Sequence, residues 1–295
     1  MIRTLFLFLS LFVIYIFFPI KYHSVSFYVI AGVNQSLDPD YRGLFWESQL
    51  DDYFLQYSID YISDGYMVVN GVEFNVLPHN SSYMRDPQLC IRTSQTWNHF
   101  LDHHSDSQWY FRGTHDTYVN VRNLLKFFEQ NYVNPMSSPI FAFNFHEFND
   151  KIYPHGGAGW LISNYGIKML NRSVNKFLKL CKRSYDDVAL GEYMELLGLN
   201  IVNWQSSKFI VTWPKDENEI VLKNKWSKVK KCPINGYRLS NHLPILPISP
   251  INDAISIHMH NMSMKIAKEI IWNIPDNIAV TFLNPDSPMF CNKYY

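Results

Sequence analysis

The stretch Trp109-Tyr-Phe-Arg-Gly-Thr-His-Asp116-Thr-Tyr-Val119 places a single carboxylate between an apolar segment and an amphipathic one. Its aromatic residues fit a buried strand, although a run of three could equally belong to a helix. After Asp116, apolar residues recur at the spacing of one helix face, which predicts a helix over residues 117–130. Because ligands bind outside the carboxyl ends of strands in an open α/β sheet, we expect a metal or phosphate ligand at Asp116. The alternative is that Asp116 only caps the helix.

The remaining chain alternates β-branched or aromatic runs with helical patterns. Strands are expected at residues 24–32, 67–69, 74–77, 140–145 and 209–213, and helices at 167–181 and 188–197. The second of these helices should end at Gly198, because glycine commonly terminates helices. This alternation predicts an α/β fold with an open, mostly parallel sheet flanked by helices.

The composition indicates an ordered protein with a large core. The 295 residues are 47% hydrophobic and 16% aromatic, and the formal net charge is +0. This length suits one large domain. The balanced charge and the lack of a Lys/Arg run argue against the basic surface that nucleic-acid binding requires.

The amino terminus carries an uncharged, apolar run at residues 4–20, between Arg3 and Lys21. Its length is near the lower limit for a membrane span. A cleaved signal peptide is the main alternative, but no small-x-small cleavage site follows the run. We expect a signal anchor in the ER or Golgi membrane, with residues 1–3 in the cytosol and residues 22–295 as one lumenal domain.

Two further features are compatible with a secretory lumen. Asn-x-Ser tripeptides that could carry glycans begin at Asn34, Asn80, Asn171 and Asn261. The cysteines are few and widely spaced, at Cys90, Cys181, Cys232 and Cys291. One or two disulfides are expected, and all three possible connectivities remain open.

Three blocks of the chain resemble one known family. Residues 109–119 are similar to the aromatic Asp-x-Asp strand of the Fringe and core 1 β1,3-galactosyltransferase family. Gly156-Gly-Ala-Gly-Trp-Leu-Ile-Ser163 resembles its Gly-Gly-Ala-Gly block, and Asp186-Asp-Val-Ala-Leu-Gly191 resembles its Glu/Asp-Asp-Val helix start. Three ordered blocks are more specific than any single motif. The resemblance spans roughly residues 95–200 and implies a nucleotide-sugar-binding fold and an inverting β1,3-glycosyltransferase.

The acidic motif departs from the family pattern. Where the family has three aspartates, this chain has Thr114, His115 and Asp116. The resemblance implies that Asp116 holds the divalent metal directly and that the position of Thr114 helps to place the nucleotide-sugar. The Thr114 hydroxyl can still hydrogen-bond a ribose or a metal-bound water, but it carries no charge. The implied nucleotide-sugar site also includes His115, Gly156, Gly157, Ala158 and Gly159.

Mn²⁺ is the expected cofactor, because hard divalent ions prefer carboxylate oxygens and Mn²⁺ also accepts imidazole. In the segment 255–260, Ser256, His258 and His260 alternate with apolar residues, so they should share one face of a strand. His258 falls where the family has a late metal-binding histidine, which implies a second ligand beside Asp116. The alternative is that these histidines are surface residues.

Two adjacent carboxylates, Asp186 and Asp187, precede the predicted helix at 188–197. One can cap the helix, and a helix start favours the charged form of the other. The resemblance implies that Asp187 is the general base of the transfer. Asp186 and Trp160 are assigned to the acceptor, and capping or solvation of both aspartates is the alternative. Three histidines are other possible bases, namely His103, His104 and His115. Adjacent histidines in a polar loop are more often simply solvated.

The resemblance also implies the reaction. Transfer from a nucleotide-sugar needs a cation that neutralises the leaving diphosphate and a base that deprotonates the attacking hydroxyl. The expected donor is UDP-galactose, and the expected acceptor is a protein-linked N-acetylgalactosamine. The same family contains a lumenal chaperone that has lost the acidic motif, and Thr114-His115 also fits that non-catalytic function. A secreted sugar-binding protein is a third possibility, which would require cleavage of residues 4–20.

Overall fold

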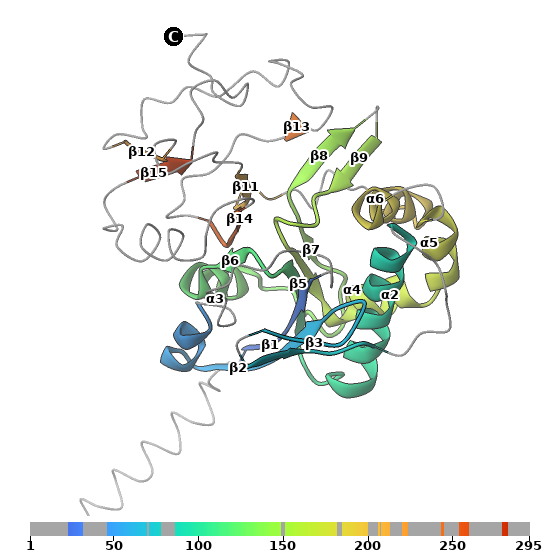
Figure 1. Ribbon diagram of the computed structural model, residues 1–295, viewed down its shortest axis with the longest axis horizontal. Coiled ribbons are helices and arrows are strands. Elements are labelled where there is room, and N and C mark those ends of the chain that lie inside the picture. The colour runs from blue at the N-terminus through green and yellow to red at the C-terminus, as the bar shows by residue number, and fades with distance from the viewer. Residues whose placement is uncertain are drawn as a thin grey trace, which may run out of the picture.

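The computed structural model describes most of the chain up to residue 199 and shorter segments beyond it (Figure 1). The described residues are 23–31, 46–69, 71–77, 86–148, 151–181, 185–199, 206, 208–212, 220–223, 243–244, 254–259 and 279–282. Several predictions lie outside these ranges, namely those for residues 1–20, Asn34, Asn80, Cys232, His260, Asn261 and Cys291. Within the described ranges, no helix has the length and apolar character needed to cross a membrane.

A five-stranded sheet forms the centre of the fold, in the order β2-β1-β5-β10-β7. Its strands are β1 (His23–Ile30), β2 (Leu55–Ile62), β5 (Trp109–Thr114), β7 (Phe141–Ala142) and β10 (Trp160–Ser163). β1 pairs in parallel with β2 and β5, whereas β10 pairs antiparallel with β5 and β7. Only β10 therefore runs against the other strands, and the mostly parallel sheet that the sequence predicts is confirmed.

Both faces of this sheet are buried, and successive residues of a strand enter different cores. In β5, Trp109 and Phe111 belong to one hydrophobic core and Tyr110 to the other. Side chains point to alternate faces along a strand, so a sheet covered on both faces needs apolar residues at nearly every position. This explains why the aromatic run at 109–111 is continuous rather than alternating with polar residues.

Helices cover both faces (Figure 1). The core that contains Tyr110 is closed by α2 (Asp86–His103), α4 (Asn164–Asn171), α5 (Val174–Cys181) and α6 (Asp186–Leu196). On the opposite face, α3 (Val121–Gln130) and the short 3₁₀ helix η1 (Glu47–Asp52) pack against Trp109 and Phe111. A disulfide between Cys90 and Cys181 joins α2 to α5, which selects one of the connectivities left open by the sequence.

Further strands form smaller sheets. β14 (Ser256–Met259) pairs antiparallel with β6 (Thr117–Val119) and parallel with β11 (Phe209–Thr212). β8 (Phe145–Phe148) pairs antiparallel with β9 (Lys151–Pro154) and with β13 (Leu243–Pro244). Two more antiparallel pairs are β3 (Met67–Val69) with β4 (Val72–Phe74), and β12 (Ile220–Lys223) with β15 (Ala279–Phe282).

The predicted helix at 117–130 is wrong at its start. Residues 117–119 form β6, and the helix begins at Val121, where Asn120 Oδ1 accepts a hydrogen bond from the Asn123 amide at 3.0 Å. Asn120 therefore caps α3, and Asp116 is not a helix cap. β6 is extended because it pairs with β14, a partner far along the chain that local helical spacing does not reveal.

Other boundaries also differ from the prediction. The segment 140–145 contributes to two strands, β7 and β8, and the segment 167–181 forms two helices, α4 and α5. β2 and α2 are absent from the prediction. In α2 the buried polar residues Thr93 and Thr96 interrupt the apolar spacing by which a helix is recognised. The end of α6 agrees with the sequence, since Gly198 follows it with a φ of 73°.

Candidate active site

Asp116 lies in the turn that joins β5 to β6, at the carboxyl edge of the central sheet. The His115 amide donates to the Ile30 carbonyl at the end of β1, with an N···O distance of 3.3 Å. The Thr114 hydroxyl donates to Asp116 Oδ1 at 2.6 Å, and Asp116 Oδ2 lies 3.3 Å from Nε2 of His258. The turn therefore occupies the edge at which α/β sheets bind ligands.

His258 reaches Asp116 because β14 pairs with β6. In this register His258 stands opposite Thr117, the residue after Asp116. Ile257 enters the hydrophobic core, whereas Ser256 donates a hydrogen bond to the Ala158 carbonyl. Ser256 and His258 thus alternate with a core residue, as the period of two along a strand requires.

The pair formed by Asp116 and His258 suits a divalent cation. Burial alone raises the pKa of Asp116, but the hydrogen bond and charge of His258, the charge of His115 and the Thr114 hydroxyl hold it well below its ordinary value. The carboxylate is therefore charged at neutral pH. Two ligands about 2.1 Å from one ion and at right angles would lie about 3 Å apart. The 3.3 Å between Asp116 Oδ2 and His258 Nε2 is close to that separation, so these side chains fit an ion such as Mn²⁺.

Gly157 packs directly against His258. A Cβ atom at this position would lie 2.4 Å from Nδ1 and Cε1 of the His258 ring. The Gly157 carbonyl accepts a hydrogen bond from the Thr117 hydroxyl at 2.9 Å, which ties the glycine turn to the Asp116 turn. Gly157 thus makes room for a side chain of the protein itself, a contact that its assignment to the nucleotide-sugar did not include.

Gly156 is in contact with the second pair of acidic residues. Its amide donates to Asp187 Oδ2 at 3.5 Å, and a Cβ atom on it would lie 2.5 Å from Nη1 of Arg112. Gly159 has a φ of 91° and packs against the Phe111 ring, so a side chain there would be strained as well as crowded. Two consecutive glycines therefore touch the candidate metal ligand and the candidate base.

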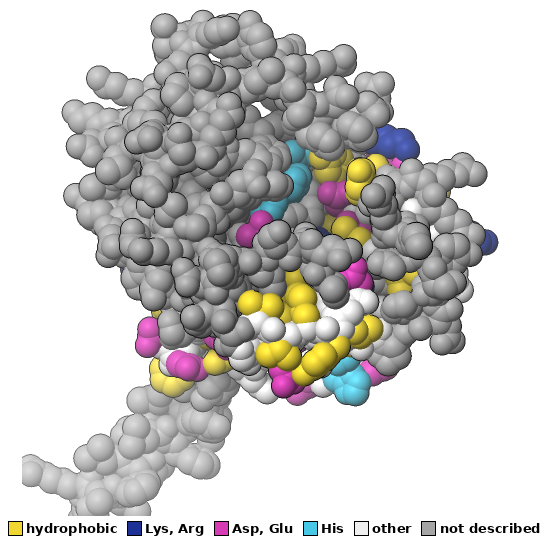
Figure 2. Space-filling model, in the orientation of Figure 1, with side chains coloured by type: hydrophobic (Ala, Val, Ile, Leu, Met, Phe, Trp, Pro, Cys, Tyr) yellow, Lys and Arg dark blue, Asp and Glu magenta, His cyan; other side chains and the backbone are white. Residues whose placement is uncertain are grey.

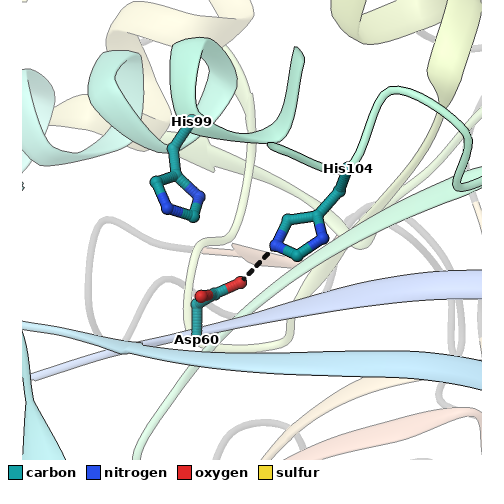
Figure 3. Close-up of side chains that lie close together, drawn as sticks. All are labelled: Asp60, His99 and His104. Carbon is teal, nitrogen blue, oxygen red and sulfur yellow. Dashed lines mark hydrogen bonds and ion pairs between the residues drawn. The ribbon is translucent and has the colours of Figure 1, made fainter. Parts of the chain in front are cut away.

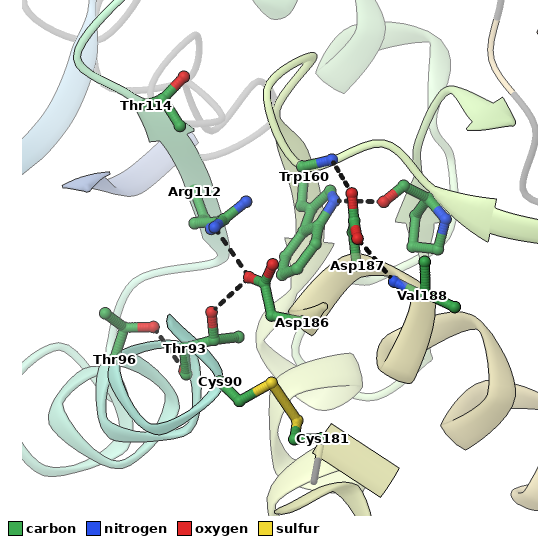
Figure 4. A network of polar contacts seen from close by, with 12 residues as sticks. Cys90, Thr93, Thr96, Arg112, Thr114, Trp160, Cys181, Asp186, Asp187 and Val188 are labelled. Atoms are coloured by element: carbon green, nitrogen blue, oxygen red, sulfur yellow. Dashed lines mark hydrogen bonds and ion pairs between the residues drawn. A yellow bond between two sulfur atoms is a disulfide. The ribbon is translucent and has the colours of Figure 1, made fainter. Parts of the chain in front are cut away.

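Asp186 forms a buried ion pair with Arg112 of β5 (Figure 4). Arg112 Nη2 donates to Asp186 Oδ2 at 2.9 Å, and the Thr93 hydroxyl donates to the same oxygen at 2.8 Å. The two ionic side chains are 2% and 3% exposed, so the pair is closed to solvent. Arg112 is the residue that the sequence analysis missed. The available signal was an arginine within an apolar strand, which needs a buried acidic partner.

Asp187 is half-buried at the first turn of α6, where its Oδ1 accepts a hydrogen bond from the Val188 amide at 2.8 Å. Burial, followed by the charge of Asp186, raises the pKa of Asp187 to about 7, although Val188, Arg112 and Gly156 act in the opposite direction. The Val188 amide at the helix start favours the charged form, as expected, but burial and Asp186 have the larger effect on the pKa. Desolvation and the adjacent acid outweigh the helix start.

The two residues assigned to the acceptor are enclosed. Trp160 is 0% exposed, its indole N–H donates to the Pro154 carbonyl at 3.2 Å, and the guanidinium of Arg112 lies 4.2 Å from its ring centroid. The ring face expected to stack on a sugar therefore contacts Arg112. Asp186 is 2% exposed and is held by Arg112 and Thr93. Both side chains are buried beneath the site and contact Arg112 rather than solvent. This corrects their assignment to the acceptor.

The outer part of the site is open. Figure 2 shows that histidine and acidic side chains meet in a hollow of this face of the molecule. The Asp116 side chain is 21% exposed, so a ligand in solution can reach it, and the His258 side chain beside it is 9% exposed. Of the predicted glycosylation sites, Asn171 is described at the end of α4, and its Nδ2 donates to Asn98 Oδ1 at 2.9 Å.

A second group of possible metal ligands lies elsewhere. One ligand atom each from Asp60, His99 and His104 lies within 4.8 Å of the other two. Asp60 is on β2, His99 is on α2, and His104 directly follows α2. The prediction that His103 and His104 belong to a polar loop is wrong for His103, which is the last residue of α2.

Comparison with known proteins shows similarity to glycosyltransferases. Over 99 residues the chain is 34% identical to glycoprotein-N-acetylgalactosamine 3-beta-galactosyltransferase 1 of Xenopus laevis. This alignment covers 32% of the chain and 26% of the relative, so the chain matches about a quarter of that protein's length. A crystal structure of a glycosyltransferase involved in the glycosylation of the major capsid of PBCV-1 aligns with a TM-score of 0.42 at 11% identity, and the alignment covers 85% of this chain and 100% of that one.

A family model described as Fringe-like matches residues 62–209, half of the 295-residue chain. The match runs from the end of β2 to the start of β11. It therefore includes the Asp116 turn, the glycine turn at 156–159 and the start of α6, the three blocks that carry the resemblance in the sequence. The chain belongs to the Fringe-like family.

Proposed function

We propose that this protein is an inverting β1,3-glycosyltransferase that transfers a sugar from a UDP-sugar to a glycan acceptor. Membership in the Fringe-like family and the 34% identity to a β1,3-galactosyltransferase support this reaction class. Galactose is the proposed donor sugar and a protein-linked N-acetylgalactosamine the proposed acceptor, since the name of the relative contains both. The proposed location is the Golgi or ER membrane, with residues 4–20 as a type II anchor.

The observation that carries the proposal is the contact of two consecutive glycines with two chemically different groups. Gly157 packs on the ring of His258, and the Gly156 amide donates to Asp187. A candidate metal ligand and a candidate base are thereby held on one turn of the chain. Glycosyl transfer needs both groups close to the same reacting carbon.

On the donor side, Asp116 and His258 would hold Mn²⁺, and Thr114 would orient the carboxylate. When bound, the ion supplies positive charge that stabilises the leaving diphosphate. The Thr114 hydroxyl donates to Asp116 Oδ1, which leaves Oδ2 beside His258 Nε2 as the second oxygen. The lowered pKa of Asp116 keeps this oxygen negatively charged at neutral pH.

On the acceptor side, Asp187 would take the proton of the attacking hydroxyl. A general base works best when its pKa is near the operating pH, and burial together with Asp186 raises the pKa of Asp187 to about 7. The amides of Val188 and Gly156 hold both oxygens in place. Asp186 is then a positioning residue, because its charge acts on Asp187 while its own oxygen stays bound to Arg112.

UDP release by the purified full chain tests the proposal, with Mn²⁺, a panel of UDP-sugars and an N-acetylgalactosamine-bearing peptide. Asp187→Asn should lower the transfer rate by about 10²–10⁴-fold, because the amide cannot accept the proton. Its oxygen can still accept a hydrogen bond from the Val188 amide, so UDP binding should persist. The matched control is Glu192→Gln, a carboxylate on the same helix that pairs with Lys151.

Two results would overturn the proposal. If the wild type transfers no sugar from any donor, the enzyme assignment fails and the non-catalytic function compatible with Thr114 is supported. If Asp187→Asn keeps the full rate, the base lies elsewhere and His115, beside Asp116, is the next candidate.

A further inference from the structure

We propose that Asp60, His99 and His104 bind a zinc ion that fastens the end of α2 to the edge strand β2, separately from the Asp116 site. The three side chains converge from two elements in Figure 3, with Asp60 on the strand and the two histidines at the end of the helix. β2 lies two strands away from β5, since β1 stands between them. The proposed zinc site and the Asp116 turn therefore belong to different parts of the sheet.

The nature of the ligands favours zinc. Two imidazoles and one carboxylate are the protein ligands of several zinc sites, which leave a fourth position for water. Zn²⁺ binds nitrogen ligands more tightly than Mn²⁺ does, so this set of ligands should discriminate against Mn²⁺. All three residues are half-buried, and a water can therefore reach the fourth position.

The hydrogen bonds behind the two histidines support the assignment. Nδ1 of His99 lies 2.9 Å from the Tyr28 hydroxyl, and Nδ1 of His104 lies 3.4 Å from the Ser58 hydroxyl. A metal-binding histidine usually donates its other ring N–H to an oxygen that fixes the tautomer. The oxygens of Tyr28 and Ser58 can accept these protons, which leaves the Nε2 atoms for the ion.

Asp60 is in contact with Nε2 of His104. Its Oδ2 lies 3.0 Å from Nε2 of His104, and it stands beside Tyr28 in the register of β1 with β2. A zinc ion bound by Asp60 Oδ2 and His104 Nε2 would replace the direct contact between these two atoms. The alternative is that Asp60 and His104 form only an ion pair that joins β2 to the end of α2.

Zinc titration of the full chain after chelator treatment separates the two possibilities. The titration is done in the Asp116→Ala protein, so that the Asp116 site does not contribute. This protein should bind zinc, and adding Asp60→Asn or His104→Gln should lower the affinity about tenfold or more. The matched control is His103→Gln, since the His103 ring lies 4.4 Å from that of His99 but is exposed and outside the ligand set.

The histidine ¹⁵N NMR spectrum gives a second readout that needs no change in the ligands. Zinc should convert two rings of the Asp116→Ala protein to the form with Nδ1 protonated and Nε2 bound to metal. The proposal is overturned if zinc changes no ring, if Asp60→Asn binds zinc as tightly as its parent, or if His103→Gln loses as much affinity as His104→Gln. A transfer activity that is absent in every variant would leave these zinc results unaffected.

Discussion

Two acid–base pairs of the site have similar chemistry but differ in exposure. The inner pair, Arg112 with Asp186, has side chains that are 2% and 3% exposed. The outer pair, His258 with Asp116, has side chains that are 9% and 21% exposed. The inner pair joins β5 to α6, and the outer pair joins β14 to the turn after β5. One strand and its following turn thus carry a closed pair and an open pair.

The difference in exposure indicates that the inner pair has a structural role and the outer pair a ligand-binding role. Removal of one partner of a buried ion pair destabilises the fold, because it leaves an uncompensated charge in the interior. The inner pair therefore fixes the start of α6 and, through the charge of Asp186, the pKa of Asp187. The outer pair can exchange its mutual contact for a ligand. The glycine turn at 156–159 contacts Arg112 of the inner pair and His258 of the outer pair, so it fixes the position of one pair relative to the other.

The largest expected effect concerns the stability of the inner pair. Asp186→Ala should lower the free energy of unfolding by about 3–5 kcal/mol, because Arg112 loses its buried partner. Denaturant unfolding measures this change. Lys151→Ala is the control, since it removes the exposed pair with Glu192 and should cost about 1 kcal/mol or less. Equal losses in the two variants would mean that the inner pair does not support the fold.

A smaller effect is expected where the glycine turn meets the outer pair. Gly157→Ala places a Cβ atom 2.4 Å from the His258 ring and should destabilise the protein by about 1–3 kcal/mol. It should also weaken Mn²⁺-dependent UDP binding, because His258 must move. In the control Gly166→Ala, the new Cβ atom lies 2.8 Å from Ile162 in the core, so it should leave UDP binding unchanged. Unchanged binding in Gly157→Ala would separate His258 from the metal site.

The smallest of these effects concerns the outer pair itself. Asp116→Ala should lower the affinity for UDP in the presence of Mn²⁺ about tenfold, or about 1.4 kcal/mol. Without Mn²⁺ the wild type and the variant should bind UDP equally weakly, because the carboxylate acts only through the ion. Calorimetry with and without Mn²⁺ measures both affinities. Tight UDP binding by the wild type without metal would contradict this role of Asp116.

The sequence predicts the outer pair better than the inner pair. Asp116, the glycines and His258 are found because their positions match a family, and the alternation with apolar residues places His258 on one face of a short strand. The strand pairing that brings His258 to Asp116 joins segments far apart in the chain, so the local pattern predicts a helix at 117–130 instead. The two residues of the outer pair could be named from the sequence, whereas the strand pairing that brings them together could not.

The inner pair is hidden in the sequence for a different reason. Arg112 is the polar residue of an apolar strand, and its partner lies on a helix 74 residues later. α2 is missed because Thr93 and Thr96 occupy its buried side, where they bond Asp186 and Tyr110. A buried polar network interrupts the apolar period that identifies a helix. The same network holds the aspartate that raises the pKa of Asp187.

The pH dependence of transfer tests the central claim that the buried inner pair tunes Asp187 as the base. Because burial and Asp186 raise the pKa of Asp187 to about 7, kcat/KM should rise about tenfold per pH unit below pH 7 and level off above it. The rising limb should disappear in Asp187→Asn, and in Asp186→Ala it should move to lower pH. A wild-type kcat/KM that stays constant from about pH 5 to 8.5, as expected for a carboxylate of ordinary pKa near 4, would contradict the account.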